Sequence, residues 1–477
     1  VGANALDANT TADYNTAIGD SSMGSTTTGG QNTAIGQASL FTNTTGIRNV
    51  ALGYDALLSS TTSSNSTAVG YSSLSSNTTG TGNTAVGYQC LDASTTASYN
   101  VAVGLGALGA CTTADHNTAV GTNALASGTT ASDCTAVGRD ACIDVTTGSQ
   151  LNAFGADSLK TAQASTQCNA FGNLALSMFN STGKNNAFGQ QALQDCTTGA
   201  SNSAFGHDCG REITTGGQNS GFGHAALQSQ TTSDNNSGFG FAALAACTTA
   251  DQNTAVGASA LAAATTGHIN TAVGANAGDS ITTGQSNCLL GVNAGAAITT
   301  GGFNVAVGEG ALVGLSTGGN NIAIGHDAAR ATSPTGNLTG ENNKICMGNN
   351  SHDNFSCKVS LTVTSDKRDK TDITDFTHGL SWITKLRPVT YRWDMRSYYE
   401  DGIPDGSKKG KRLNIGLLAQ EELEVEKEHG FANDKNDMLI TTENAEGNYG
   451  MEYERIVPIL INAIKELSAE VNALKAA

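Results

Sequence analysis

The sequence has 477 residues, a formal net charge of −17 and only 5% aromatic residues. This charge excludes proteins that hold nucleic acid on a basic surface, because an acidic surface repels phosphate. The sequence lacks the run of about 18 apolar residues that a membrane-spanning helix needs. Residues 1–357 hold 50 of the 58 glycines, whereas residues 358–477 hold both tryptophans and 17 of the 24 lysines and arginines. The chain is therefore expected to contain two parts of different construction.

A glycine recurs every 17 residues from Gly2 to Gly325, without insertion, giving 20 glycines in all. Each ends a short cassette, most often Asn-Thr-Ala-Val-Gly, and the next cassette ends only at Gly348, 23 residues on. A fixed period of this kind is typical of solenoids, in which each repeat packs on its neighbours. The sequence predicts an all-β solenoid over residues 1–348, a parallel β-roll of 17-residue coils.

Positions within a coil are numbered here from the period glycine, which is position 0. Position −1 is bulky and apolar, position −2 is nearly always Ala or Gly, and position +4 is Leu in 14 of the 20 coils. The alternation before the glycine predicts one strand, and the Ala-Leu signal predicts a second strand near positions +3 to +7. We expect the −1 side chains to fill the interior of the roll. The tiny −2 residues are then expected to face neighbouring chains, which favours a homotrimer.

Three further columns of the repeat predict ladders of stacked side chains. Six consecutive coils carry Phe at position −1, which predicts an aromatic ladder in the core, with Gly221 and Gly238 at −2 providing space for it. Asn at position −4, from Asn15 to Asn321, predicts a hydrogen-bond ladder at a turn. The phenylalanines are Phe154, Phe171, Phe188, Phe205, Phe222 and Phe239.

Thr-Thr pairs occupy positions +8 and +9 in 16 of the 20 coils. Ranks of Thr also occur in ice-binding β-solenoids, which is an alternative interpretation. Adjacent residues of a strand point in opposite directions, however, so turn-forming, solvated Thr is preferred.

The 11 cysteines form no C-x-x-C pair and are dispersed along the repeats. A metal site needs converging ligands, so no metal and no cofactor are predicted. The cysteines are interpreted as small buried residues in a reducing compartment, and pairing between adjacent coils stays open.

The cassette resembles the head repeats of trimeric autotransporter adhesins and similar repeats in phage and large-virus fibres. That resemblance implies three chains, each forming a parallel β-roll around a common axis. The period of 17 residues is longer than the usual adhesin period.

The sequence after Gly348 has a different character. A link at 349–364 includes a predicted strand at 357–364 and leads into Ser-Asp-Lys-Arg-Asp-Lys at 365–370. A helical stretch, a strand and an Ile-Gly-Leu-Leu-Ala-Gln-Glu segment follow at 380–386, 389–393 and 415–421. The last helix, from about Tyr453, has apolar residues spaced 3 and 4 apart, which predicts a short trimeric coiled coil. Its seam consists of Val457, Leu460, Ile464, Leu467, Val471 and Leu474.

In their order, these segments over 365–477 resemble the S74-type intramolecular chaperone domain. The resemblance implies a domain that trimerises, assists folding of the fibre before it and then cuts itself off. Endosialidase tailspikes, L-shaped phage tail fibres and a membrane-bound eukaryotic transcription factor carry such domains. We expect an α+β domain that ends in the coiled-coil helix.

The chemistry of cleavage follows from the residue types at 365–370. A serine hydroxyl needs a base, and an unprotonated lysine can act as that base in a Ser-Lys dyad. Ser365 and Lys370 are the predicted catalytic pair of a single-turnover serine endopeptidase, and the cut falls at Thr364–Ser365 or Ser365–Asp366. The lysine must lose its proton, which requires burial or nearby positive charge. Arg368 and Lys367 favour that loss, whereas Asp366 and Asp369 oppose it unless they point outward.

The sequence thus predicts a trimeric tail fibre of a phage or virus, which is assembled in the host cytoplasm and binds a host-surface receptor, of which a glycan is one candidate. A bacterial cell-surface trimeric adhesin is the alternative, with a virion or extracellular location in either case. A depolymerising tailspike enzyme would need paired carboxylates, and the acids of the repeats recur at no paired spacing. The chain opens inside a cassette at Val1-Gly2, so an N-terminal extension is expected.

Overall fold

The computed structural model describes residues 2–331, 333, 335–352, 356, 358, 363–444 and 447–476. The chain divides into two compact units. One runs to Ile324 and includes Thr339–Ile345, and the other comprises Gly325–Leu338 and the chain from Cys346 onward. Each unit is described by itself. None of the helices in the described residues is long and apolar enough to cross a membrane.

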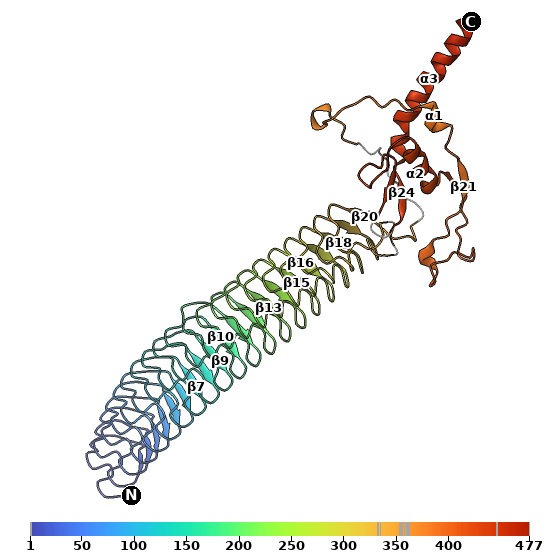
Figure 1. Cartoon of the computed structure of the whole chain (residues 1–477). Coiled ribbons are helices and arrows are strands. Elements are labelled where there is room, and N and C mark those ends of the chain that lie inside the picture. Colours follow the sequence, from blue (N-terminus) through green and yellow to red (C-terminus); the bar gives the residue numbers. More distant parts are fainter. Residues whose placement is uncertain are drawn as a thin grey trace. The chain divides into compact units, whose positions relative to one another are not determined.

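The first unit is a stack of coils, each with one three-residue strand at positions −3 to −1 (Figure 1). Each strand pairs in parallel with the equivalent residues of the next coil, as Thr16 pairs with Thr33. The predicted parallel β-solenoid of 17-residue coils is confirmed. The strands of this 20-stranded sheet are β1 (Thr16–Ile18), β2 (Thr33–Ile35), β3 (Val50–Leu52), β4 (Thr67–Val69), β5 (Thr84–Val86), β6 (Val101–Val103), β7 (Thr118–Val120), β8 (Thr135–Val137), β9 (Asn152–Phe154), β10 (Asn169–Phe171), β11 (Asn186–Phe188), β12 (Ser203–Phe205), β13 (Ser220–Phe222), β14 (Ser237–Phe239), β15 (Thr254–Val256), β16 (Thr271–Val273), β17 (Cys288–Leu290), β18 (Val305–Val307), β19 (Ile322–Ile324) and β20 (Ile345–Met347).

The predicted second strand at +3 to +7 is wrong, because this part of each coil is a turn. Positions +2 and +4 have positive φ, as in Ala38 and Leu40, both at 53°. That left-handed backbone cannot continue a strand. The turns still connect the coils, since the Leu40 N–H donates to the Ala56 carbonyl at 2.9 Å. The Ala-Leu signal therefore marks buried turn positions.

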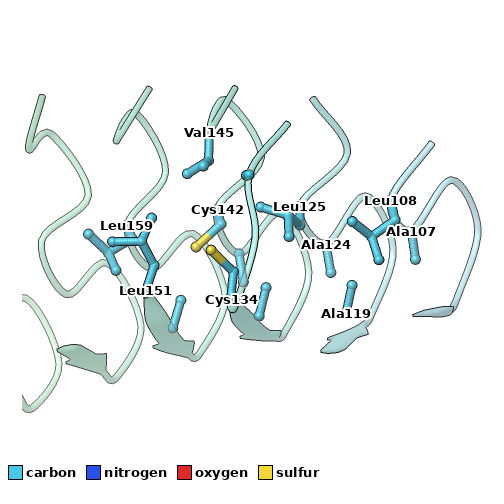
Figure 2. Close-up of a cluster of buried hydrophobic side chains, with 14 of the residues drawn as sticks. Ala107, Leu108, Ala119, Ala124, Leu125, Cys134, Cys142, Val145, Leu151 and Leu159 are labelled. Atoms are coloured by element: carbon cyan, nitrogen blue, oxygen red, sulfur yellow. The ribbon is translucent and has the colours of Figure 1, made fainter. Parts of the chain in front are cut away.

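The expected orientation of the strand is also wrong. Ala34 and Ala51 at position −2 are fully buried, whereas Ile35 and Leu52 at position −1 are each 37% exposed. The interior is narrow, and the position +4 leucines already occupy it. Figure 2 shows Leu108 and Leu125 directed into the same core as Ala119 and Ala124. Only a methyl group fits opposite the leucines, so the bulky −1 side chains point out of the roll.

The six phenylalanines do form a ladder, but on the outside of the roll. Neighbouring rings stack with centroids 4.6 Å apart between Phe154 and Phe171 and 5.0 Å apart between Phe222 and Phe239. The expected ladder is confirmed, and its expected place in the core is wrong. Gly221 and Gly238 make room for core side chains instead. A Cβ on Gly221 would lie 2.5 Å from the Cys209 sulfur.

The period glycine is required by both backbone conformation and space. Gly121 has φ of +136°, which L side chains rarely adopt, and a Cβ there would lie 2.5 Å from the Gly138 carbonyl oxygen. The same contact repeats along the glycine column. The glycine that recurs every 17 residues is therefore required because backbone stacks closely on backbone at this position.

Side-chain hydrogen bonds tie each coil to the next at two corners. Asn15 Oδ1 accepts the Asn32 backbone N–H at 2.9 Å, and Asn32 Nδ2 donates to the Gly46 carbonyl at 2.9 Å. The predicted asparagine ladder is confirmed. At the other corner the Thr27 hydroxyl donates to the Thr44 carbonyl at 3.0 Å. The first threonine of each pair therefore donates its hydroxyl hydrogen bond to the next coil.

The ten cysteines of the described residues are free, and all except the half-buried Cys288 are buried. Cys134 and Cys142 face the same apolar core in Figure 2. Burial raises the pKa of the Cys90 thiol to about 12, which disfavours the reactive thiolate. The interpretation as small buried residues is confirmed for nine of these ten, and Cys357 lies outside the described residues.

The second unit is a small α+β region with a core around Trp382, which is fully buried with Ile440 and Ile459. Strands β21 and β22, and β23 and β24, form two antiparallel pairs. The predicted helix at 380–386 and strand at 389–393 are present in shorter form, and most of the strand expected at 357–364 lies outside the described residues. The elements are η1 (Lys367–Asp369), α1 (Leu380–Ile383), β21 (Val389–Tyr391), η2 (Arg396–Tyr398), β22 (Asn414–Gly416), α2 (Ala419–Glu428), β23 (Thr441–Glu443), β24 (Tyr449–Met451), η3 (Tyr453–Arg455) and α3 (Ile456–Ala476).

Candidate self-cleavage site

The segment after Thr364 folds into a single 3-10 turn, η1, that brings its two ends together. Asp366 begins the turn and accepts the Arg368 backbone N–H at 2.9 Å. The Lys370 N–H donates to the Lys367 carbonyl at 3.3 Å and closes the turn. Residues five apart in sequence therefore come within side-chain reach.

The turn places the Lys370 ammonium next to the Ser365 hydroxyl. Lys370 Nζ lies 2.6 Å from Ser365 Oγ, which is hydrogen-bonding distance. A lysine in contact with a serine is the arrangement that a Ser-Lys dyad requires. Their catalytic roles stay a prediction, as does the cut next to Thr364 or Ser365.

Charges around the dyad are partly neutralised within the turn. Arg368 pairs with Asp366, with Nη2 and Oδ2 2.7 Å apart. The side-chain hydrogen bond from Arg368 and the Arg368 backbone N–H lower the pKa of the Asp366 carboxyl. Within this pair the positive charge of Arg368 and the negative charge of Asp366 largely cancel, so neither acts strongly on Lys370. The other charged residues of the turn are Lys367 and Asp369.

Both members of the dyad are exposed in the single chain, and so is Thr364. An ammonium group in water keeps its proton near neutral pH, and burial is what favours the neutral amine. The contact between the two side chains is therefore present in an exposed turn.

The predicted coiled-coil seam lies on α3 and is exposed along its length. The exposed fraction of its side chains ranges from 40% at Leu460 and Val471 to 78% at Leu474. The adjacent face, with Ile459 and Ala463, is buried in the unit. An apolar hollow of about 340 Å³ between β22 and α3 continues from Leu460. The seam thus has no partner within the chain's described residues, and its role in trimer formation stays a prediction.

Two buried carboxylates were missed by the sequence reasoning. Glu426 is fully buried and accepts three backbone N–H groups, from Leu439, Ile440 and Thr441, at 2.7–3.0 Å. Glu422 is 1% exposed and accepts the Trp382 indole N–H at 2.9 Å. Both glutamates lie with apolar Leu423 and Val425 on one buried face of α2. Their charge is typical of a solvated helix face, so the sequence alone did not predict their burial.

Glu422 predicts a pH-dependent stability of the second unit. Burial, with the nearby Glu426 charge, raises its pKa to about 7, although the Trp382 hydrogen bond acts the other way. Between the ordinary value of 4.5 and about 7 the folded state holds more protons than the unfolded state, so stability falls as pH rises. At pH values above that range the free energy of unfolding is lower by about 3 kcal/mol. Glu422→Gln is expected to flatten this dependence.

Tryptophan fluorescence during denaturant unfolding measures this effect, because the repeats contain no tryptophan. The full chain would carry Ser365→Ala so that both units stay joined. Glu424→Gln is the matched control, since Glu424 lies on the same helix with a 70% exposed side chain. An unfolding midpoint of the Ser365→Ala chain that stays constant from pH 4.5 to 8 would contradict the prediction.

Comparison with known protein families agrees with the position of the candidate self-cleavage site at Ser365. Residues 365–431 match the model of the peptidase S74 family, which is described as chaperone of endosialidase. The match begins at Ser365, directly at the dyad. No curated protein and no solved structure gives a significant match to the chain. The resemblance of the repeats to adhesin heads therefore stays an expectation.

Proposed function

We propose that the chain is a homotrimeric fibre protein, with the β-solenoid as shaft and residues 365–477 as an intramolecular chaperone that releases itself by Ser365–Lys370 autoproteolysis. The single observation that carries the proposal is the S74 match, which starts at the dyad and follows a solenoid. The fibre is proposed to serve host attachment for a phage or virus. The other observations support its separate steps.

The first step concerns the shaft, whose −1 column forms an exposed apolar stripe along the roll. An exposed apolar surface of this length marks an interaction site. Because each coil is small and has a core of mainly Leu and Ala, burial against two further copies adds the stabilisation that a thin roll lacks. This outward stripe replaces the −2 face as the expected trimer contact. Its members that are at least 36% exposed are Ile18, Ile35, Leu52, Val103, Val120, Phe222, Phe239, Val256, Val273, Leu290 and Ile324.

The second step concerns register. In-register coils of nearly identical sequence could pair with a neighbouring chain at many offsets of 17 residues. The α3 seam and the apolar hollow beside it offer a non-repeating surface that fixes three chains at one level. We propose that the chaperone sets this register before the shafts associate.

The third step is release. Three assembled chaperone copies would cover the exposed turn at Ser365, lower its contact with water and favour the neutral form of Lys370. Lys370 then takes the serine proton, and the serine oxygen attacks the carbonyl carbon of the scissile peptide bond. As that C–N bond breaks, the leaving amine takes the proton from Lys370, and water then hydrolyses the resulting ester and restores the serine hydroxyl. Cleavage after assembly leaves the trimeric shaft and a free chaperone.

Cross-linking tests the shaft contact directly. Val273→Cys places an exposed thiol in the stripe, where the native residue is 38% exposed. Three copies that meet along the stripe are expected to give a dimeric band with a short bis-maleimide on a denaturing gel, because one accessible thiol per chain can link only two chains. Sedimentation equilibrium should give a mass of three chains.

The control for cross-linking is Met178→Cys, which is 50% exposed at position +6 and outside the stripe. It should remain monomeric on the gel, as should the unsubstituted chain, in which nine of the ten described cysteines are buried. Cross-links through Met178→Cys and none through Val273→Cys would contradict the proposed contact. A solution mass of one chain would contradict the trimer itself.

A further inference from the structure

Two consecutive coils of the roll bring histidines together beside a buried carboxylate. His207 and Asp208 follow the period glycine of one coil, and His224 follows that of the next. Because the coils stack in register, the imidazoles of His207 and His224 lie one above the other, with ring centroids 5.1 Å apart and planes within 4°. His207 Nδ1 lies 3.0 Å from Asp208 Oδ2.

The three side chains offer converging ligand atoms. One ligand atom from each of His207, Asp208 and His224 lies within 4.8 Å of the others. Both imidazoles are exposed, whereas Asp208 is only 9% exposed. Two imidazoles and a carboxylate are the donor set that divalent transition metals such as Zn²⁺ prefer.

The Asp208 carboxylate has spare acceptor capacity. Its Oδ1 atom is buried and has no hydrogen-bond partner among the described residues. The nearest cation, Arg211, stays 3.8 Å away through Nη1 and directs Nη2 to Glu212 at 2.6 Å. Asp195 also acts on Arg211, so three carboxylates surround one guanidinium and the local charge favours a cation.

A second copy of the same motif shows what the site looks like without the second histidine. His326, Asp327 and Arg330 occupy the same coil positions as His207, Asp208 and Arg211. There Arg330 Nη1 bonds Asp327 Oδ1 at 2.7 Å, and His326 Nδ1 is 3.7 Å from Asp327 Oδ2. That carboxylate is already paired with its arginine. The carboxylate oxygen without a hydrogen-bond partner is thus found in the motif that has a second histidine, His224, and not in the motif at Asp327.

We propose that His207, Asp208 and His224 bind one divalent transition-metal ion of the Zn²⁺ class per chain. Donors on one Zn²⁺ lie about 3.4 Å apart for metal–ligand bonds of about 2.1 Å. Rotation of the two exposed imidazoles can bring the ligand atoms from within 4.8 Å of one another to that shorter separation. The bound ion clips two adjacent coils together next to the phenylalanine ladder. The site is independent of the proposed chaperone and fibre function.

Titration of the full-length Ser365→Ala chain with ZnCl₂ in a calorimeter tests the site. We expect His224→Ala and His207→Ala each to weaken the tightest Zn²⁺ binding at least tenfold, and Asp208→Asn to weaken it measurably. His326→Ala is the matched control and should leave that binding unchanged. Substitution of Co²⁺ should give visible absorption in the parent chain that His224→Ala loses.

Hydrogen exchange separates binding from folding. Saturating Zn²⁺ is expected to slow exchange in the coils around β12 and β13 in the parent chain and to have no such effect in His224→Ala. The proposal is overturned if His207→Ala and His224→Ala bind Zn²⁺ as tightly as the parent chain. It is equally overturned if His326→Ala weakens binding to the same extent.

Discussion

Ser365→Ala is expected to abolish release of the C-terminal fragment of about 113 residues, 365–477. The substitution removes the hydroxyl that Lys370 contacts, and loss of a nucleophile lowers the rate of such reactions by a factor of about 10³ or more. A denaturing gel of freshly refolded chains measures the fragment over time. A wild-type chain that never releases it would contradict the protease assignment, although the trimer could persist.

Lys370→Arg sharpens the test of the dyad. Arginine keeps the positive charge and can donate to Ser365, but it does not lose its proton in proteins. If Lys370 acts as a base, Lys370→Arg is as inactive as Ser365→Ala. If it only positions the serine, Lys370→Arg retains cleavage. Lys385→Ala is the control, because Lys385 is engaged with Glu428 at 2.6 Å, away from the turn.

The proposed dependence of cleavage on trimer assembly is measured separately, from the cleavage half-time at different chain concentrations. Cleavage that waits for trimer formation speeds up as the chain concentration rises, because association precedes the chemical step. A half-time that is independent of concentration would contradict activation by assembly and leave the dyad intact. The two parts of the proposal therefore fail separately.

Gly121→Ala is expected to be strongly destabilising, by about 3 to 5 kcal/mol, because it combines backbone strain with overpacking. Gly121 has φ of +136°, and the new methyl would lie 2.5 Å from the Gly138 carbonyl oxygen. Neither neighbour can yield, since both are backbone in a continuous stack. In a solenoid the damage centres on the interface between adjacent coils. Hydrogen exchange should show β7 and β8 opening first, with a lower melting temperature of the shaft.

Gly109→Ala provides the matched control in the preceding coil. Gly109 has no left-handed φ, and its new methyl would lie no closer than 3.2 Å to the Gly106 carbonyl oxygen. The equivalent position in the next coil is Ala126. The change is expected to cost less than about 1 kcal/mol. Equal melting temperatures for Gly121→Ala and Gly109→Ala would contradict the stacking explanation of the period.

The sequence determined the solenoid because a period of 17 residues with one glycine per turn leaves few alternatives. It also determined the ladders, since identical residues at a fixed spacing must stack when coils are in register. Ser365 and Lys370 could be named together from their residue types and spacing. Even so, only the turn at 367–369 shows that their side chains touch.

The tertiary structure decided which face of each strand is inside. Alternation separates two faces but carries no information on the space available to each. Leu at +4 fills the roll from the opposite side, so Ala is inside and the Val, Ile or Phe beside it is outside. The same stacking joins His224 to His207 and Asp208 across 17 residues, which no local motif indicates. The period of the sequence determined the coil. The limited volume inside the coil decided which side chains are buried and which form the outer surface available to partners.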